Sequence, residues 1–409
     1  MKPQQLTEGT GARIKIYRLA ADLTQPQLAT AIGKSVPWLK QIENGQRYTD
    51  RLTDLQNIAD VVGCSLNDLL SHPIDSLAPG VRPRADLVTA VRDAMLRVPV
   101  YKAPPGTVSD LDDMGTRVAE AWTIWHDSPT AHRSLGNILP NLILDATAQH
   151  QIAGDGDKRV SARILTGTWQ VTRQWLHHVP DADLAWVAAD RAMSNAQKAD
   201  DPRLIALGAW ALSASYRRAG QQDAATQLCL DAAEEVNSHI DTSNPQKDLL
   251  AAFGMLNLAA SISAAQSDED GRAWALHRVA EDTANTLGGH IDPWTMFGRA
   301  NVDIHGLALR AEFGDADAVV EYGHRLDLDQ MPSVERRSRA LIDTARGLVR
   351  RGEDEGAMLV LIDAERISQD EVHHSGLVQD MLRELLHRDR ARARPHVREM
   401  AKRCGVLRA

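Results

Sequence analysis

A pattern of small and apolar residues is repeated along the C-terminal three quarters of this 409-residue chain. In each copy, an apolar stripe at helical spacing is followed by a turn and by a second stripe that opens on a small or apolar residue. These opening residues lie 39 to 48 residues apart, at Leu184, Ala225, Ala273, Ala318 and Ala357. Small residues at such positions let two helices approach closely, and stacked helix pairs then bury a continuous core. The pattern therefore predicts a stack of helix hairpins.

The composition favours helices throughout the chain. Aromatic residues make up 4% of it, and the runs of valine, isoleucine, tyrosine and phenylalanine that form strands are scarce. No segment shows the sustained alternation of apolar and polar residues that marks a half-buried strand. Hydrophobic residues at 43% and charged residues at 25% are close to the globular average, which predicts a buried core. We therefore expect an all-α protein.

Two stretches rich in proline and glycine divide the chain. Helical periodicity runs through residues 11–70 and stops at the segment SHPIDSLAPGVRPRA. One helix is expected at 85–97, before a second such stretch, VPVYKAPPGTVS. We therefore predict a head at residues 1–72, a linker with one helix at 73–109, and a helical tail at 110–409.

The segment TQPQLATAIGKSVPWLKQIENGQ in the head has the signals of two short helices joined by a tight turn. Thr24 and Gln27 form a capping box at the start of the first helix, and Ser35 caps the second. Gly33 supplies a bend that a residue with a Cβ would resist. The apolar positions expected to be buried are Leu28, Ala29, Ile32, Leu39 and Ile42.

These residues resemble the helix-turn-helix of the phage-repressor or XRE type, in which TQxxLA opens the first helix and a run ending in ENG closes the second. The resemblance implies a five-helix head that binds DNA. It also implies an ion pair between Arg18 and Glu43, which we expect to be buried between the first and third helices of the head. The chain departs from the usual phage members by a longer loop after Gly45 and by the apolar Val36 and Pro37.

In this type of domain the second helix of the motif lies in the major groove, with its N-terminal residues at base edges. The resemblance puts Val36, Pro37 and Gln41 at base-reading positions. A valine suits a thymine methyl group, and a glutamine suits adenine. Phosphate contacts, which set the register without reading the sequence, are expected from Gln25, Lys40, Asn44, Arg47 and Arg51. The predicted DNA-binding set is completed by Lys34 and Ser35 at the turn.

The repeats of the tail resemble tetratricopeptide (TPR) repeats. The clearest copies lie at residues 209–232 and 341–364, with Gly220 and Gly352 in their turns. The resemblance implies a TPR-like α-α superhelix in which the first helix of each hairpin lines a concave groove. The alternative is an irregular bundle rich in alanine and leucine.

A ligand groove on that inner face would be lined by tryptophans and by polar side chains. The predicted ligand-binding residues are Trp169, Arg173, Trp210, Arg217, Asn301, Asp303, His305, Arg346 and Arg350. Indole rings offer a stacking surface and guanidinium groups hold carboxylates, so a peptide or an acidic small molecule suits this set. The alternative is that the tryptophans pack between hairpins and the arginines pair with neighbouring carboxylates.

Charge separates the two ends of the chain. The net charge is −9, whereas residues 1–72 contain one more basic than acidic residue. Any DNA contact is therefore expected at the head. The arginine-rich run at 388–398 has two interpretations, a second nucleic-acid patch or a polar cap on the end of the stack, and we favour the cap.

The sequence gives no support to an enzyme, metal or cofactor function. The three cysteines at 64, 229 and 404 are too far apart for a zinc knuckle or a disulfide framework. The histidine pairs at 177–178 and 373–374 lack the spacing of metal ligands, and none of the common catalytic motifs is present. The most apolar stretch, 249–265, is interrupted by polar residues and predicts a core helix rather than a membrane span. The N-terminus lacks the apolar core of a signal peptide, so we expect a cytoplasmic protein.

The combined pattern predicts a transcription regulator that binds a double-stranded DNA operator as a homodimer and whose tail senses a peptide, a small molecule or a protein. The segment MFGRANVDIHGLAL in the tail is similar to one found in XRE regulators of GC-rich bacteria. The alternative is an interaction adaptor or antitoxin whose tail holds a protein partner and whose head localises it to DNA. A toxin gene in the same operon would favour that alternative.

Overall fold

The computed structural model describes residues 10–44, 52–64, 69, 85–97, 110–179, 182–241, 243–388, 390 and 392–407. These residues form α-helices and short 3-10 turns and contain no strand, which confirms the predicted all-α class. The predicted helix at 85–97 is present as α6 (Ala85–Leu96). The predicted domain boundaries at residues 72 and 109 lie outside the described residues, as does the expected fifth helix of the head apart from Leu69.

The described residues form two compact units. The terminal unit contains the four head helices and the C-terminal helices. Its elements are α1 (Thr10–Ala20), α2 (Gln25–Ala31), α3 (Val36–Glu43), α4 (Leu52–Val62), α16 (Ala316–Arg325), most of α17 (Val334–Arg351), α18 (Asp354–Ile367), α19 (Gln369–His373), α20 (Gly376–Arg388) and α21 (Arg394–Arg403).

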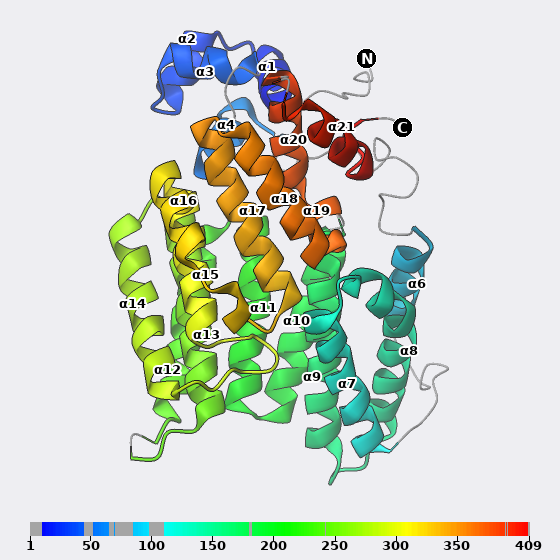
Figure 1. Cartoon of the computed structure of the whole chain (residues 1–409). Helices are drawn as coiled ribbons and strands as arrows, with labels where there is room; N and C mark the ends of the chain where they lie inside the picture. The colour runs from blue at the N-terminus through cyan, green and yellow to red at the C-terminus, as the bar shows by residue number, and fades with distance from the viewer. Residues whose placement is uncertain are drawn as a thin grey trace. The chain divides into compact units, whose positions relative to one another are not determined.

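The central unit contains the helices between them along the chain, together with a short segment before α17. Besides α6, its elements are α7 (Leu111–Asp127), α8 (Ala131–Ile152), α9 (Lys158–Trp175), η2 (Leu176–His178), α10 (Ala182–Ala199), α11 (Pro202–Arg218), α12 (Gln222–Ser238), α13 (Lys247–Gln266), α14 (Asp270–Leu287), most of α15 (Arg299–Phe313) and η3 (Leu328–Gln330). Figure 1 shows α9 to α14 as successive helices lying side by side.

The head folds as its local signals predict. The Thr24 hydroxyl accepts a hydrogen bond from the Gln27 backbone N–H at 3.4 Å, and the Gln27 side chain accepts one from the Thr24 N–H at 2.8 Å. The Ser35 hydroxyl caps α3 by accepting from the Trp38 N–H. Gly33 has a φ of +66°, so the turn between α2 and α3 uses the left-handed backbone conformation that glycine tolerates best. The buried core of the head contains all five predicted apolar positions together with Ile14, Leu55, Ile58, Ala59, Val62 and Leu69.

Stacked helix pairs follow the head, as the repeat pattern predicts. In the central unit, Gly220 takes a φ of +75° in the turn between α11 and α12, and Ala225 on α12 is fully buried. In the terminal unit, Gly352 takes the same φ between α17 and α18, and Ala357 is fully buried. Each alanine sits near the start of the second helix of its hairpin, where a larger side chain would hold the two helices apart.

Helix α13 is the most apolar element of the central unit. Among the described helices it alone is long and apolar enough to cross a membrane by length and composition, and 72% of that stretch is buried inside the protein. The prediction of a core helix at 249–265 is therefore confirmed. Gly254 on α13 leaves room for the fully buried ring of Phe297, which a Cβ at this position would overlap.

Candidate nucleic-acid interface

A buried ion pair joins the first helix of the head to the second helix of the helix-turn-helix. The Arg18 Nε and Nη2 atoms on α1 donate to the two carboxylate oxygens of Glu43 on α3, at 2.5 and 2.9 Å. Gln25 at the start of α2 donates from Nε2 to Glu43 Oε2 at 2.8 Å. The side chains of Arg18 and Glu43 are 7% and 0% exposed, so the predicted buried pair is confirmed. Hydrogen bonding to Glu43 raises the pKa of Arg18, which keeps this guanidinium charged.

A close backbone approach also holds α1 against α3. Gly11 on α1 faces the Ile42 carbonyl oxygen, and a Cβ at this position would overlap that atom. The ion pair and the glycine contact together fix α3 against the rest of the head. The face of α3 that points to solvent is therefore presented by a rigid support.

That outer face carries most of the predicted DNA-binding residues. Val36 is 36% exposed, and the remaining exposed positions of the predicted set are Ser35, Pro37, Lys40, Gln41 and Asn44. A line of polar and small apolar groups on the outside of a recognition helix is what base-edge and phosphate contacts require.

Two predicted residues are engaged inside the head instead of being fully exposed. The Lys34 Nζ lies 2.7 Å from an Asp54 carboxylate oxygen and 5.4 Å from the centre of the Trp38 ring. Gln25 is half-buried because of its bond to Glu43. Arg47 and Arg51, which were predicted to hold phosphates, lie outside the described residues.

The predicted ligand-binding residues of the central unit lie in packed surroundings. Trp169 and Trp210 are 4% and 6% exposed and belong to the apolar cores, and the Arg191 guanidinium lies 4.8 Å from the Trp169 ring centre. Asn301 and His305 are also buried. The remaining polar members have partners within the unit: Arg173 with Gln174, Arg217 with Ser213 and Ser263, and Asp303 with Arg299.

Arg346 and Arg350, the other two members of that set, belong to the terminal unit. Arg346 is 4% exposed and lies 3.2 Å from a Glu312 carboxylate oxygen, and Arg350 donates to the Ala311 carbonyl oxygen at 3.0 Å. Packing and internal pairing account for the positions of Trp169, Trp210 and Arg346. Ligand binding by the whole set stays a prediction.

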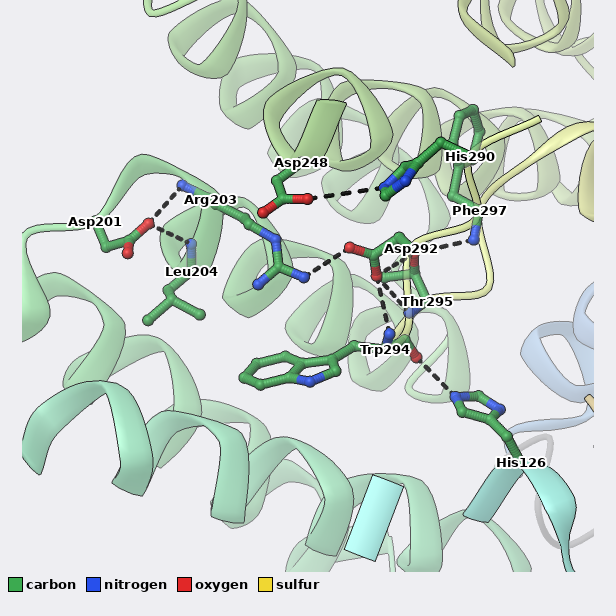
Figure 2. A network of polar contacts seen from close by, with 10 residues as sticks. All are labelled: His126, Asp201, Arg203, Leu204, Asp248, His290, Asp292, Trp294, Thr295 and Phe297. Carbon is green, nitrogen blue, oxygen red and sulfur yellow. Dashed lines mark hydrogen bonds and ion pairs between the residues drawn. The ribbon is translucent and has the colours of Figure 1, made fainter. Parts of the chain in front are cut away.

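The sequence analysis missed a polar network in the central unit, shown in Figure 2. It is centred on Asp292, in the loop between α14 and α15. One carboxylate oxygen of Asp292 accepts from the Arg203 guanidinium at 2.6 Å, and the other accepts from the Trp294 N–H, the Thr295 N–H and the Thr295 hydroxyl at 2.8–3.0 Å. Burial acts to raise the pKa of Asp292, but Arg203 and the Thr295 donors hold that pKa below its usual range.

The network fixes Trp294 against α7 and α11. Its ring stacks on Trp122 of α7 with centres 5.5 Å apart, and the Arg203 guanidinium of α11 lies 5.1 Å from the ring centre. Its carbonyl oxygen lies 3.1 Å from His126 Nε2 (Figure 2), while His126 Nδ1 contacts the Ser333 hydroxyl. Burial lowers the pKa of His126 to about 4, so this imidazole is neutral near pH 7. We call residues 288–298 the anchor loop, since its contacts tie separate hairpins together.

One local signal pointed to this loop. An aspartate whose side chain accepts from the backbone two and three residues later forms an Asx-type turn, and the run DPWT at 292–295 has the matching residue types. Nothing in the sequence, however, identified Arg203 as the partner 89 residues away. Among the described residues no group of three or more histidine, cysteine, aspartate or glutamate side chains is arranged to hold a metal ion.

Comparisons with known proteins support the assignment of the head. A family model described as a helix-turn-helix domain matches residues 11–71, and this match indicates DNA binding. No curated protein matches the chain significantly. Among solved structures, the crystal structure of BtubC (BKLC) from P. vanneervenii shares 16% identity and a TM-score of 0.36, over 63% of this chain and 91% of that one. A likeness of that size carries no argument about the tail.

Proposed function

We propose that this protein is a transcription regulator of the XRE type that binds an operator through α3. The observation that carries the proposal is the exposed outer face of α3, with Val36, Lys40, Gln41 and Asn44, on a helix whose inner face is fixed by the buried Arg18–Glu43 pair. Rigid support of a recognition helix allows a few side chains to discriminate between bases. The helix-turn-helix match over residues 11–71 agrees with this role.

The test begins with a genome-wide map of binding sites, from which the operator is taken. Gln41→Ala is then expected to lose about 1–3 kcal/mol of discrimination at one base position, because a bidentate contact to adenine is removed. Arg51→Ala is expected to weaken binding to all sequences alike and to reduce the slope of log affinity against log salt by about one. If Gln41→Ala retains the full sequence preference of the parent, α3 does not read the operator.

We further propose that the operator is bound by a homodimer. One helix-turn-helix reads only a half-site, whereas two heads related by a two-fold axis read a pseudopalindrome with half-sites about one helical turn apart. Sedimentation of the full chain, alone and with operator DNA, measures this directly. A monomeric mass in both samples would refute the dimer.

The tail is proposed to receive the signal. Its candidate contact in the central unit is Arg217, which is half-buried, and an acidic peptide or small molecule suits its guanidinium group. Because Trp210 lies in the core, Trp210→Ala would damage the fold, and Arg217→Gln is the gentler variant. Arg217→Gln is expected to bind the operator normally and to lose the response to cell extract, and an unchanged response would remove this residue from the mechanism.

A further inference from the structure

The C-terminal helix α21 carries a basic stripe that the proposed function does not use. Arg394, Arg398 and Lys402 are all exposed and follow one another at intervals of four residues. At about 100° and 1.5 Å per residue, successive members lie about 40° apart around the helix and about 6 Å apart along it. A different side of α21 supplies Val397, Met400 and Ala401 to the core of the terminal unit.

Other arginines near the C-terminus pair with internal carboxylates. Arg388 and Arg390 lie 2.8 and 3.1 Å from the two oxygens of Asp354. Arg403 donates to both oxygens of Glu365 at 2.7 Å. Burial acts to raise the pKa of Glu365, but His373 and Arg403 hold it at about 2. These three arginines are therefore engaged within the terminal unit. Arg394 makes a contact of its own within the protein, whereas Arg398 and Lys402 have no carboxylate partner among the described residues.

A buried contact within the terminal unit connects the head to the helix that supports α21. The Thr10 hydroxyl of α1 lies 3.4 Å from an Asp380 carboxylate oxygen of α20, and Arg383 donates to the other oxygen at 2.8 Å. Asp380 lies about 150° around α20 from the apolar side formed by Val378, Met381, Leu382 and Leu385. It is nevertheless 6% exposed, so a second layer must cover this side of α20.

Thr10 and its neighbour Arg13 on α1 are 8% and 3% exposed, which agrees with α1 forming that second layer. Helix α21 packs directly on α20. The stripe and the recognition helix α3 are therefore parts of the same compact unit. A duplex bound by α3 would bring a dense row of negative charge to the unit that carries these exposed cations, because duplex DNA carries one charge per about 1.7 Å of its axis.

We propose that α21 is a second DNA-contacting element whose basic stripe binds backbone phosphates outside the site read by α3. This inference rests on the proposed function. Contacts from arginine and lysine to phosphates add affinity and fix position but do not read bases. In a chain with a net charge of −9, such a stripe also offsets the repulsion between the acidic tail and DNA.

The experiment compares two triple variants of the full chain that remove the same charge. The test variant is Arg394→Ala/Arg398→Ala/Lys402→Ala. The control is Arg159→Ala/Arg272→Ala/Arg278→Ala, which removes three exposed arginines of the central unit. Operator binding is measured from low to moderate salt, and circular dichroism with thermal melting checks that both variants fold.

The stripe variant is expected to lower the slope of log affinity against log salt by up to about 2.7 per protomer, since each phosphate contact contributes about 0.9. Its ratio of operator to scrambled-DNA affinity should equal that of the parent. The control should keep the parental slope. A folded stripe variant with the parental slope, or equal slope changes in both variants, would overturn the inference.

Failure of the inference and failure of the proposed function give different results. If only the inference is wrong, the parent binds its operator, Gln41→Ala loses base discrimination, and the stripe variant behaves like the parent. If the proposed function is wrong, the parent shows no preferred sequence at any salt concentration, and the inference is then overturned with it.

Discussion

Two arginine–carboxylate pairs, one in the head and one in the central unit, have different roles. Arg18–Glu43 in the head joins two helices and supports the helix proposed to read DNA. Arg203–Asp292 in the central unit fixes a loop that connects separate hairpins. Glu43 accepts hydrogen bonds from the side chains of Arg18 and Gln25, whereas Asp292 also accepts hydrogen bonds from two backbone N–H groups. The head therefore depends on each side chain that donates to Glu43. The loop, by contrast, keeps most of the hydrogen bonds to Asp292 when one donor is lost.

The largest loss of unfolding free energy is expected from Glu43→Ala. Removing one member of a buried pair leaves the other charge uncompensated and typically costs about 3–5 kcal/mol. The head should unfold at lower denaturant concentration and operator binding should be lost with it, as measured by urea unfolding and a binding titration. A melting temperature within a degree of the parent would mean that the pair does not stabilise the head.

Acidification is expected to lower the free energy of unfolding of the central unit by up to about 3 kcal/mol relative to that of the head. The folded pKa of His126 is about 4, below its ordinary 6.5, so the unfolded chain takes up the proton first. Its contribution is complete above pH 6.5 and is lost as the pH falls toward 4, with a shift of one unit worth about 1.4 kcal/mol. Residues 10–64 contain no histidine, so the head has no equivalent response.

The measurement for this prediction is urea unfolding of the full chain at pH 7, 5.5 and 4. His126→Gln should be less stable than the parent at pH 7 and should lose less stability on acidification. Since His305 also has a lowered pKa, about 3, the informative quantity is the difference between parent and variant. Parallel pH curves for the two proteins would show that His126 does not titrate on unfolding.

A smaller loss of unfolding free energy, about 2 kcal/mol, is expected from Arg203→Ala. Asp292 retains the Trp294 and Thr295 donors, so the loss is one charged hydrogen bond and one cation–π contact. Arg18→Ala serves as the comparison and should cost more, because it removes two of the three bonds to Glu43. Equal unfolding energies for Arg18→Ala and Arg203→Ala would contradict the distinction between the two pairs.

The smallest effects are expected at two glycines with positive φ. Gly33 in the head and Gly288 in the anchor loop have φ values of +66° and +59°, and no atom lies within 4 Å of a Cβ built on either. Alanine at each position therefore tests backbone strain alone, expected at about 1–2 kcal/mol. The two variants should differ little from each other in chemical unfolding, and a much larger loss at Gly288 would show that the loop is the more constrained region.

Sequence reasoning succeeded where structure is determined locally. The caps at Thr24 and Ser35, the bend at Gly33 and the helix hairpins around Gly220 and Gly352 depend on residues a few positions apart. The Arg18–Glu43 pair came from the resemblance to a known domain and is confirmed. The same resemblance predicted which face of α3 is exposed, although the DNA contacts of that face stay a prediction.

The contacts that escaped prediction join distant parts of the chain. Arg203 and Asp292 are 89 residues apart, and Thr10 and Asp380 are 370 apart. Aspartates and arginines are common in this sequence, and no spacing rule selects one pair among so many. The tryptophan positions show the same limit, because a helical stripe of large side chains faces either a groove or a core, and packing of the neighbouring hairpin decides which.

The fit of Phe297 over Gly254 has an evolutionary consequence. Since the ring occupies the volume that a side chain at 254 would fill, position 254 cannot gain a side chain while Phe297 keeps its place. A lineage that gains an alanine at 254 must at the same time shorten the residue at 297. Related sequences should therefore show these two positions varying together, in descendants that pair a glycine with an aromatic ring or a larger residue with a small one.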